Sequence, residues 1–591
     1  MQRNVSAIVR YIYAWVSLSC IGAITMQATS ADSLILKALI DEVERNMQEI
    51  RYKDYAQPFY ISFTIEDIHT LYVDASFGAI INCNEKKDRS WANRVLCGSY
   101  QLNDENYYDA TRTKASGDGS LSLPLDTDYW GIRRALWLII NNTYKSAAQT
   151  YQNKIEALKE KNFPHDSLEI PDFAMAPTLH LSLESKVKIA PLDSVKSLVR
   201  ELSGIFNNKK EISYSNVSYY QIHAKIYFYS SENTRIIFPL DYTMLNIGAL
   251  SEKYGETVSD ALTYVERNPD RIFSQRLHIM ANIDSMCAKL EAKATASYVK
   301  ENYFGPVLFF EQAAAQAWLQ GLFGYPDNLF AYREPLYNTS NKTLYYGQNM
   351  NSLETRINKP VIDRNISIYD IANRSQWKGI DLLGYYPVDA EGVVPTDSLV
   401  LFDNGILKTL YNGRTPTRNV PASNGHMRFN FSNGAILSGL GPGNLVIRAQ
   451  KSYPDVQLKK MLIQKAQEQG LDYAYIVRPN LRGNVLTSLN LYQVEVATGT
   501  EKLVRGAMLK PLSINTLRKN TIVSSNTYVY NGFLNDNLLN IDGSNILSQN
   551  SIPDGTPISV ICPSAVMLED VELTFYNKSL IDEKPIVPRP E

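Results

Sequence analysis

Histidine, a frequent metal ligand and general base in proteins, is scarce in this chain. The six histidines are His69, His165, His180, His223, His278 and His426, and the closest two are 15 residues apart. A zinc site built on one helix needs two ligands about one turn apart on the same face. The sequence contains no such histidine pair, so a metal centre would have to be assembled from distant residues.

Cysteine offers no metal signature either. Beyond the N-terminal segment the chain has Cys83, Cys97, Cys287 and Cys562, none of them in a Cys-x-x-Cys pair. Cys83 and Cys97 could form a disulfide across a short loop in an oxidising compartment. The alternative is that all four are buried free thiols.

The stretch from Leu383 to Arg428 carries the most local information. Asp403-Asn404-Gly405 separates two apolar runs, 399–402 and 406–410. Asn-Gly in this position is a strong signal for a tight β-hairpin. Glycines recur along the stretch, which is typical of short strands that fold back around a cleft.

Three short motifs follow one another in this stretch, namely Glu391-Gly392, Gly413-Arg414 and Asn424-Gly425-His426-Met427-Arg428. In this order they resemble the TldD/PmbA family of metalloprotease-like proteins, also called the modulator of DNA gyrase family. Segments 305–311, 229–233 and 563–573 agree with the resemblance, which covers most of the chain. The family has a Ser-Glu-Gly turn where this chain has Ser231-Glu232-Asn233.

The resemblance implies a zinc site that this chain lacks. Catalytic relatives bind zinc through a His-Glu-x-x-x-His helix and a cysteine near the C-terminus, with the glutamate as general base. The matching segment here is 310–315, and both histidine positions are apolar, at Phe310 and Ala315. Only Glu311 remains, so we expect no metal ligands and no cofactor, although catalytic relatives carry zinc.

Glu311 is the residual catalytic candidate. If its helix packs as in the family, the carboxylate is buried and needs donors, and Arg414 and Arg428 are the expected partners. The alternative is a solvated glutamate on the first helical turn, where the helix dipole favours it. The candidate substrate-binding residues, for an extended peptide, are Asn424, Gly425, His426, Arg428 and Arg414. His426 could instead be a hydrogen-bonding surface residue.

The N-terminus has the layout of a secretory signal peptide. Arg3 and Arg10 precede an apolar segment, 11–26, and small residues end at Ala31. We expect cleavage near Ala31 and export to the periplasm or the exterior, with an uncleaved envelope anchor as the alternative. No second apolar stretch is long enough to span a bilayer. A net charge of −2 argues against nucleic acid as a ligand.

Periodicity predicts a series of helices and strands. The expected helices are 32–47, a long helix from Asp126 or Asp128 to about 161, 192–206, a helical segment 257–300, and 453–469. The expected strands are 58–65, 71–81, 94–102, 179–183, 219–229, 235–244, 473–478 and 489–497. We predict an α+β, multi-domain fold in which N-terminal αβ sheets are joined by the long helix to a C-terminal domain rich in antiparallel strands.

The expected organisation has five parts: signal peptide 1–31, N-terminal αβ domain 32–125, long helix and central αβ domain 126–300, C-terminal metalloprotease-like domain 301–577, and Pro-rich tail 578–591. The leading functional hypothesis is an exported, zinc-less family member. It would act as a non-catalytic partner subunit or a module for peptides or unfolded polypeptide, in a homodimer or a heterodimer with a related subunit. The alternatives are an active metallopeptidase with an unconventional site and a structural protein of the cell envelope.

Overall fold

The computed structural model describes residues 30–109, 121–160, 169–252, 258–324, 328–338, 344–346, 353–432, 434–478, 490–535 and 552–575. The predicted signal peptide lies outside these ranges up to residue 29, and the predicted Pro-rich tail lies outside them entirely. Within the described part of the chain, no helix is long and apolar enough to cross a membrane.

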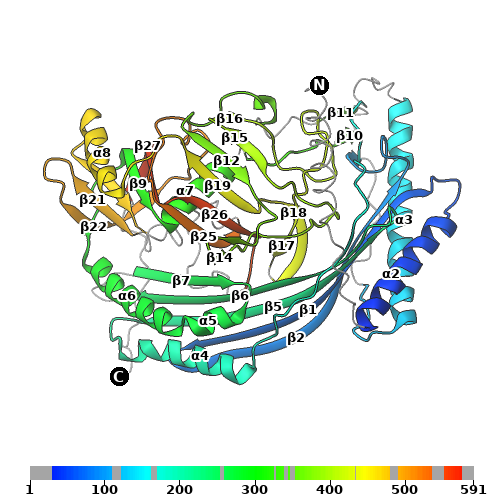
Figure 1. Ribbon diagram of the computed structural model, residues 1–591, viewed down its shortest axis with the longest axis horizontal. Helices are drawn as coiled ribbons and strands as arrows, with labels where there is room; N and C mark the ends of the chain where they lie inside the picture. The colour runs from blue at the N-terminus through cyan, green and yellow to red at the C-terminus, as the bar shows by residue number, and fades with distance from the viewer. Residues whose placement is uncertain are drawn as a thin grey trace, which may run out of the picture.

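A long, curved sheet forms the N-terminal half of the described structure (Figure 1). Its neighbouring strands follow the order β2-β1-β5-β6-β4, and β7 pairs with β6. The strands are β1 (Pro58–Ser76), β2 (Ala79–Cys97), β4 (His180–Ser182), β5 (Tyr214–Ser230), β6 (Arg235–Ser251) and β7 (Val258–Glu266). Because β1 pairs with β5, a single sheet spans the two units predicted to meet at residue 126.

Two sequence predictions in this half are wrong. The expected strands 58–65 and 71–81 form one strand up to Ser76, because Glu66 is buried and Asp67 binds Arg89 of β2. The polar dipeptide therefore does not interrupt the strand, and the chain turns instead at Phe77-Gly78. The segment 257–300, expected to be helical, instead starts with the strand β7. This strand pairs with β6 and buries only part of its side chains.

Helices cover one face of the curved sheet. At one end lie α2 (Ser30–Glu49) and α3 (Tyr129–Glu160), and at the other lie α4 (Leu192–Gly204), η2 (Ile205–Asn208), α5 (Pro269–Ser274) and α6 (Arg276–Thr295) (Figure 1). Alternation along β5 shows that both faces are buried. Val217, Tyr219 and Tyr227 pack with the helices, whereas Ile222 and Phe228 face the C-terminal part of the chain.

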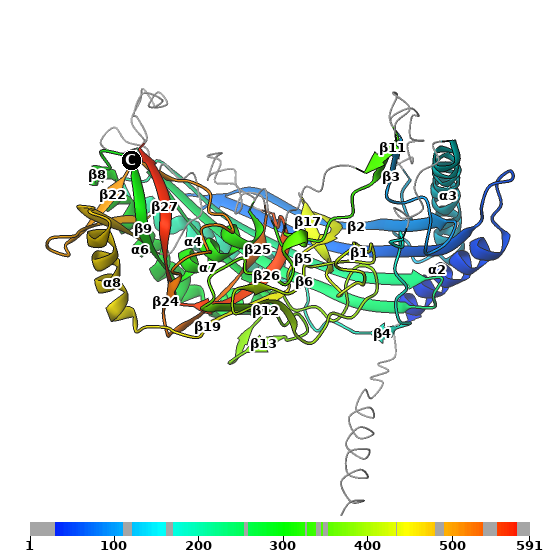
Figure 2. The same ribbon diagram turned by 90° about the horizontal axis from the view of Figure 1, so that it is seen from above.

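Two larger sheets build the C-terminal part. The first contains β12 (Ile366–Asp370), β15 (Leu399–Asp403), β16 (Ile406–Leu407), β19 (Asn444–Ala449), β25 (Thr527–Leu534) and β26 (Thr556–Pro563). The second contains β8 (Ser297–Tyr298), β9 (Tyr303–Phe310), β20 (Tyr473–Val477), β21 (Leu491–Glu495), β22 (Glu501–Arg505), β23 (Ala507–Leu509), β24 (Ile522–Val523) and β27 (Ala565–Phe575). The two sheets lie on the concave side of the curved sheet (Figures 1 and 2).

Short sheets and two further helices complete this part. They are β3 (Tyr107–Asp109) with β10 (Leu336–Asn338) and β11 (Leu344–Tyr346), β13 (Gln376–Trp377) with β14 (Ile380–Asp381), β17 (Met427–Ser432) with β18 (Ala435–Leu440), η4 (Glu354–Arg356), α7 (Gln312–Phe323) and α8 (Asp455–Glu468). The predicted hairpin is present between β15 and β16, with positive φ at both Asn404 and Gly405, as a tight type I′ turn requires.

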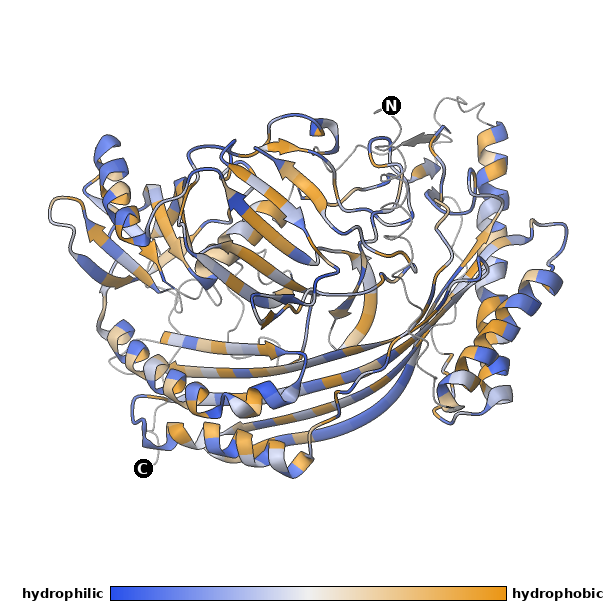
Figure 3. Cartoon of the chain, in the orientation of Figure 1, coloured by the Kyte–Doolittle hydropathy of each residue, from blue (hydrophilic) through white to orange (hydrophobic). Residues whose placement is uncertain are grey.

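Apolar side chains join the two halves. Figure 3 shows hydrophobic residues concentrated on the C-terminal strands, while the long exposed section of β2 is hydrophilic. Between the halves, Phe238 packs against Phe429 with ring centroids 5.6 Å apart, and Tyr242 packs against Phe431 at 5.4 Å. The fold is therefore α+β and multi-domain, as predicted, although α3 packs on the curved sheet beside α2 instead of bridging two separate sheets.

The four cysteines after the N-terminal segment are free. Cys83 and Cys97 lie on the same strand, β2, with Cys83 exposed and Cys97 buried at its end. An extended strand rises about 3.3 Å per residue, so the two sulfurs are much too far apart for a bond. The alternative of a Cys83–Cys97 disulfide is therefore wrong, and the alternative of four free thiols holds, although Cys83 is exposed and not buried.

Candidate functional site

Glu311 lies at the junction between β9 and α7, not within the helix. Its backbone has φ 49°, its N–H donates to the Ser564 carbonyl at 2.6 Å, and its carbonyl accepts from Ala315 N–H at 3.0 Å. This left-handed turn ends the strand and starts the helix, and it leaves the Glu311 side chain exposed. The predictions that Glu311 is buried and binds Arg414 or Arg428 are therefore wrong.

The surroundings of Glu311 do not fit the zinc site implied by the family. Ala313, Ala314 and Ala315 are fully buried in α7, which is buried on all sides after its first residue and packs with the strands of both C-terminal sheets. Phe310 packs under the guanidinium of Arg478, at 5.4 Å from the ring centroid. Across the described ranges, no three His, Cys, Asp or Glu side chains lie together as a metal would require.

Tyr528 and Ser564 are the polar neighbours of this junction. Burial, followed by the negative charge of Glu311, raises the pKa of the Tyr528 hydroxyl. The Ser564 hydroxyl donates to Ser524 at 2.9 Å, and Asn526 donates to Asp455 at 2.7 Å. These side chains bond to one another, and they hold the β25, β27 and α8 ends beside Glu311.

Arg414 forms an ion pair that joins the two halves of the molecule. Its guanidinium donates two hydrogen bonds to Glu232, at 2.7 and 2.8 Å, in the planar bidentate geometry that favours arginine. The side chain is 1 % exposed and lies over the ring of Phe173 at 4.1 Å. The Gly-Arg motif and the Ser-Glu-Asn turn thus meet in space, 182 positions apart.

The Asp-Ala-Glu-Gly segment lies beside this ion pair. Glu391 accepts a hydrogen bond from the Arg414 backbone N–H at 2.5 Å and pairs with Arg94 of β2. Asp389 accepts three backbone N–H groups, those of Glu391, Val393 and Met427. Burial, and then the charge of Glu391, raises the pKa of Asp389 to about 8. Asp389 is therefore held neutral, or nearly so, at the interface.

His426 is fully buried, so the prediction that it lines an open groove or lies on the surface is wrong. Its Nδ1 lies 2.9 Å from the Asn424 carbonyl, its Nε2 lies 3.6 Å from Asp370, and its ring packs 4.7 Å from that of Tyr411. Asp370 also accepts from Tyr411 and from the Gly443 N–H. Burial alone would raise the pKa of Asp370, but His426 and these donors outweigh it and lower the pKa.

Arg428 is buried among backbone carbonyls and an aromatic ring. Its guanidinium donates to the carbonyls of Pro442 and Pro557 and lies 3.9 Å from the centroid of the Tyr386 ring. Burial lowers its pKa. Two carbonyls and an aromatic face thus solvate this cation, and the side chain fastens β17 to β26.

Asn424 and Gly425 shape the loop before β17. The Asn424 side chain donates to the Leu410 carbonyl at 2.8 Å and accepts from the Asn412 N–H at 2.9 Å. Gly425 has φ 76°, and a Cβ there would lie 2.6 Å from the Pro395 Cα. Both residues therefore hold the backbone together, and their contact with a peptide stays a prediction.

Asn424, Gly425, His426 and Arg428 thus lie together at the start of β17, and Arg414 lies on the neighbouring loop, where Asn412 bonds Asn424. Glu311 lies apart from them, at the β9–α7 junction. Sequence reasoning missed Asp370, Asp389, Arg94 and Tyr411. Asp389 could have been found, because it belongs to the acidic motif before Gly392. Arg94 and Asp370 carry no local signal, since their partners are distant in sequence.

Comparisons with known proteins agree with this architecture. Residues 335–567 match the model of the PmbA/TldA metallopeptidase C-terminal domain. No curated protein matches the chain in sequence.

Three solved structures share the fold. TldE from Thermococcus kodakarensis is 12% identical with a TM-score of 0.53, covering 91% of this chain and 100% of its own. A proposed modulator of DNA gyrase from Thermotoga maritima is 12% identical with a TM-score of 0.52, covering 87% and 96%. Another from Bacteroides thetaiotaomicron is 10% identical with a TM-score of 0.52, covering 93% and 100%. Residues 335–567 are therefore similar to the PmbA/TldA metallopeptidase C-terminal domain, and the fold of the three solved structures is shared over most of the chain.

Proposed function

We propose that this is an exported TldD/PmbA-family protein that takes part in proteolysis without a zinc centre, as a peptide-binding module or the non-catalytic partner of a related subunit. The observation that carries the proposal is the segment around Glu311. Its glutamate is exposed on a left-handed turn, and Phe310 and Ala315 occupy the positions where catalytic relatives have histidines.

The buried charges of the interior support a binding function that needs the architecture of the fold and no catalytic metal. Removing charged side chains from water is costly unless each is paired in good geometry. The chain nevertheless buries Arg414 where its two halves meet, and Asp370 and Arg428 within its C-terminal part. A protein with these costly interior charges and an apolar segment at the family's metal position fits a subunit that keeps the architecture and presents a surface to peptides.

Metal analysis of the purified full-length protein tests this proposal. We expect less than stoichiometric zinc, and no chelator-sensitive hydrolysis of an unfolded polypeptide such as reduced casein. Binding of the same polypeptide, measured by light scattering or calorimetry, should persist in the presence of chelator. One bound zinc per chain, together with hydrolysis that chelator abolishes and Glu311→Gln removes, would overturn the proposal in favour of an active metallopeptidase.

Export is tested separately, by N-terminal sequencing of the protein from its native host. We expect the mature chain to begin near Asp32, after the small residues that end at Ala31. A mature chain that begins at Met1 would contradict cleavage and leave the other parts of the proposal untouched.

A further inference from the structure

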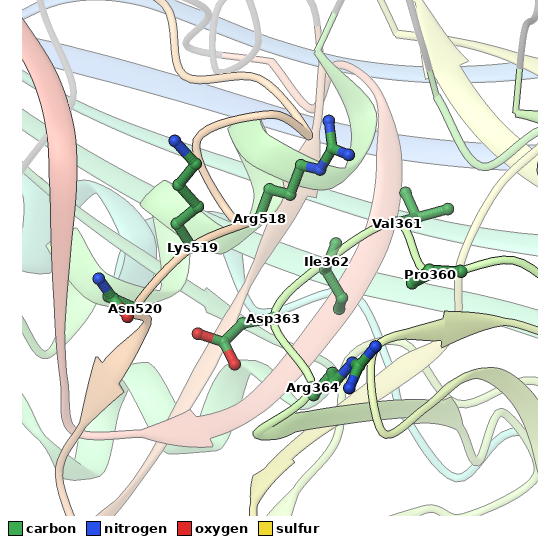
Figure 4. A pocket seen from close by; sticks show the side chains of 8 residues that line it. All are labelled: Pro360, Val361, Ile362, Asp363, Arg364, Arg518, Lys519 and Asn520. Carbon is green, nitrogen blue, oxygen red and sulfur yellow. The ribbon is translucent and has the colours of Figure 1, made fainter.

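A cavity of about 440 Å³ lies between two C-terminal segments, 360–364 before β12 and 518–520 before β24 (Figure 4). Leu517, next to this second segment, packs against Gly321 of α7, so the cavity lies on a rigid support. Its volume falls within the range of small-ligand pockets. The cavity is separate from both Glu311 and the Arg414 ion pair.

Positive charge dominates the lining. Arg364, Arg518 and Lys519 are exposed cations at the cavity, and no salt bridge or side-chain hydrogen bond joins them to an acidic residue within the described ranges. Figure 4 shows Arg518 and Lys519 extending from one loop and Arg364 from the facing segment. Such unpaired side chains are free to turn toward a bound anion.

The single acidic side chain of the lining, Asp363, is already engaged. One of its oxygens accepts from the Asn365 N–H at 2.8 Å, and the other accepts from the Thr521 N–H at 2.7 Å. The Asp363 N–H in turn donates to the Leu517 carbonyl at 2.9 Å. Asp363 therefore ties the two segments together and sets the width of the cavity, and it leaves a net positive lining.

The remaining lining residues are apolar or already hydrogen-bonded to another side chain. Pro360, Val361 and Ile362 provide the apolar wall, and Asn520 donates its amide to Glu569 at 2.8 Å. A lining of this kind suits a ligand with one oxyanion group and a small apolar body. Arginine binds carboxylate and phosphate oxygens through two parallel hydrogen bonds, and lysine contributes a point charge.

We propose that this cavity, here called the basic pocket, binds an oxyanion group, a carboxylate or a phosphate, through Arg364, Arg518 and Lys519. The carboxylate could be the free end of a peptide, and the phosphate a free or small-molecule phosphate. The basic pocket does not depend on the proposed function, because it needs neither zinc nor a partner subunit.

Isothermal titration calorimetry of the full-length protein with three probes tests the site. The probes are tetraalanine with a free C-terminal carboxylate, the same peptide amidated, and inorganic phosphate. We expect at least one oxyanion probe to bind and the amidated peptide to give no binding. Binding of the free peptide alone identifies a peptide end as the ligand, and binding of phosphate alone identifies a phosphate.

The double variant Arg518→Ala/Lys519→Ala should weaken that binding by at least about tenfold, since it removes two of the three cations that would form charge-assisted hydrogen bonds to the oxyanion. The matched control is Lys86→Ala/Lys87→Ala, which removes the same charge from the exposed section of β2. Circular dichroism confirms that both variants fold. Absence of binding by every probe, or an equal loss in the control, would overturn the proposal.

Discussion

Two regions of this protein differ in whether charged side chains are buried. At the interface between the halves, the guanidinium of Arg414 is 1% exposed and is bonded to Glu232, whose side chain is 14% exposed. At the β9–α7 junction, where the resemblance implies metal ligands, the flanking side chains are apolar and Glu311 is exposed. Buried charge in this fold thus serves to join domains, and the family position for metal chemistry holds none.

The largest effect is expected from breaking the Arg414 ion pair. Arg414→Met leaves Glu232 facing the interface without its bidentate partner, and removing one member of a buried pair typically costs about 3–5 kcal/mol. We expect the urea midpoint of unfolding to fall accordingly. Adding Glu232→Gln should recover part of the loss, because the unpaired charge is removed.

The matched control is Lys86→Met, which breaks the exposed pair with Asp88. Exposed pairs are worth about 0–1 kcal/mol. If both single variants lower stability equally, the Arg414 pair is not a structural contact between the halves.

A smaller change in the free energy of unfolding is expected when the pH is raised. Burial raises the pKa of Glu66 to about 7 and, together with Glu391, that of Asp389 to about 8. Their folded-state values exceed their unfolded values, so the stability that they contribute is complete below about pH 4 and is lost as the pH rises through 7 to 8. The slope is at most about 1.4 kcal/mol per pH unit for each group.

Urea unfolding at pH 5 and pH 8 measures this dependence. We expect the protein to be less stable at pH 8, and Asp389→Asn to reduce the difference between the two conditions. Glu311→Gln is the control and should leave the difference unchanged. Equal stability of the unaltered protein at both pH values would contradict the role of the buried carboxyl groups.

The smallest effect is expected from Glu311→Gln itself. Because the side chain is exposed and its backbone contacts are retained, the free energy of unfolding should change by less than about 0.5 kcal/mol. Thermal denaturation at neutral pH measures it. A loss of several kcal/mol in the free energy of unfolding would show that the Glu311 side chain has a partner in the folded protein. The β9–α7 junction and the interface would then no longer differ in this respect.

Local features of the fold could be predicted from the amino-acid sequence alone. The Asn-Gly turn needs positive φ at two successive residues, and glycine and asparagine adopt it readily, so the hairpin at 404–405 was predictable. Gly470 ends α8 in the same way, with φ 70°. The apolar residues at Phe310 and Ala315 and the family resemblance were likewise readable from the chain.

The pairing of charged side chains, in contrast, depends on the tertiary fold. Arg414 meets Glu232, and Arg94 meets Glu391 nearly three hundred positions away, so no local pattern encodes either contact. Strand β1 continues through Glu66 and Asp67 because β2 supplies Ser90 and Arg89 as partners. The position of Glu311 depends on a left-handed turn fixed by a hydrogen bond to Ser564. The conformational preferences of neighbouring residues cannot predict contacts that form only when distant strands come together in the fold.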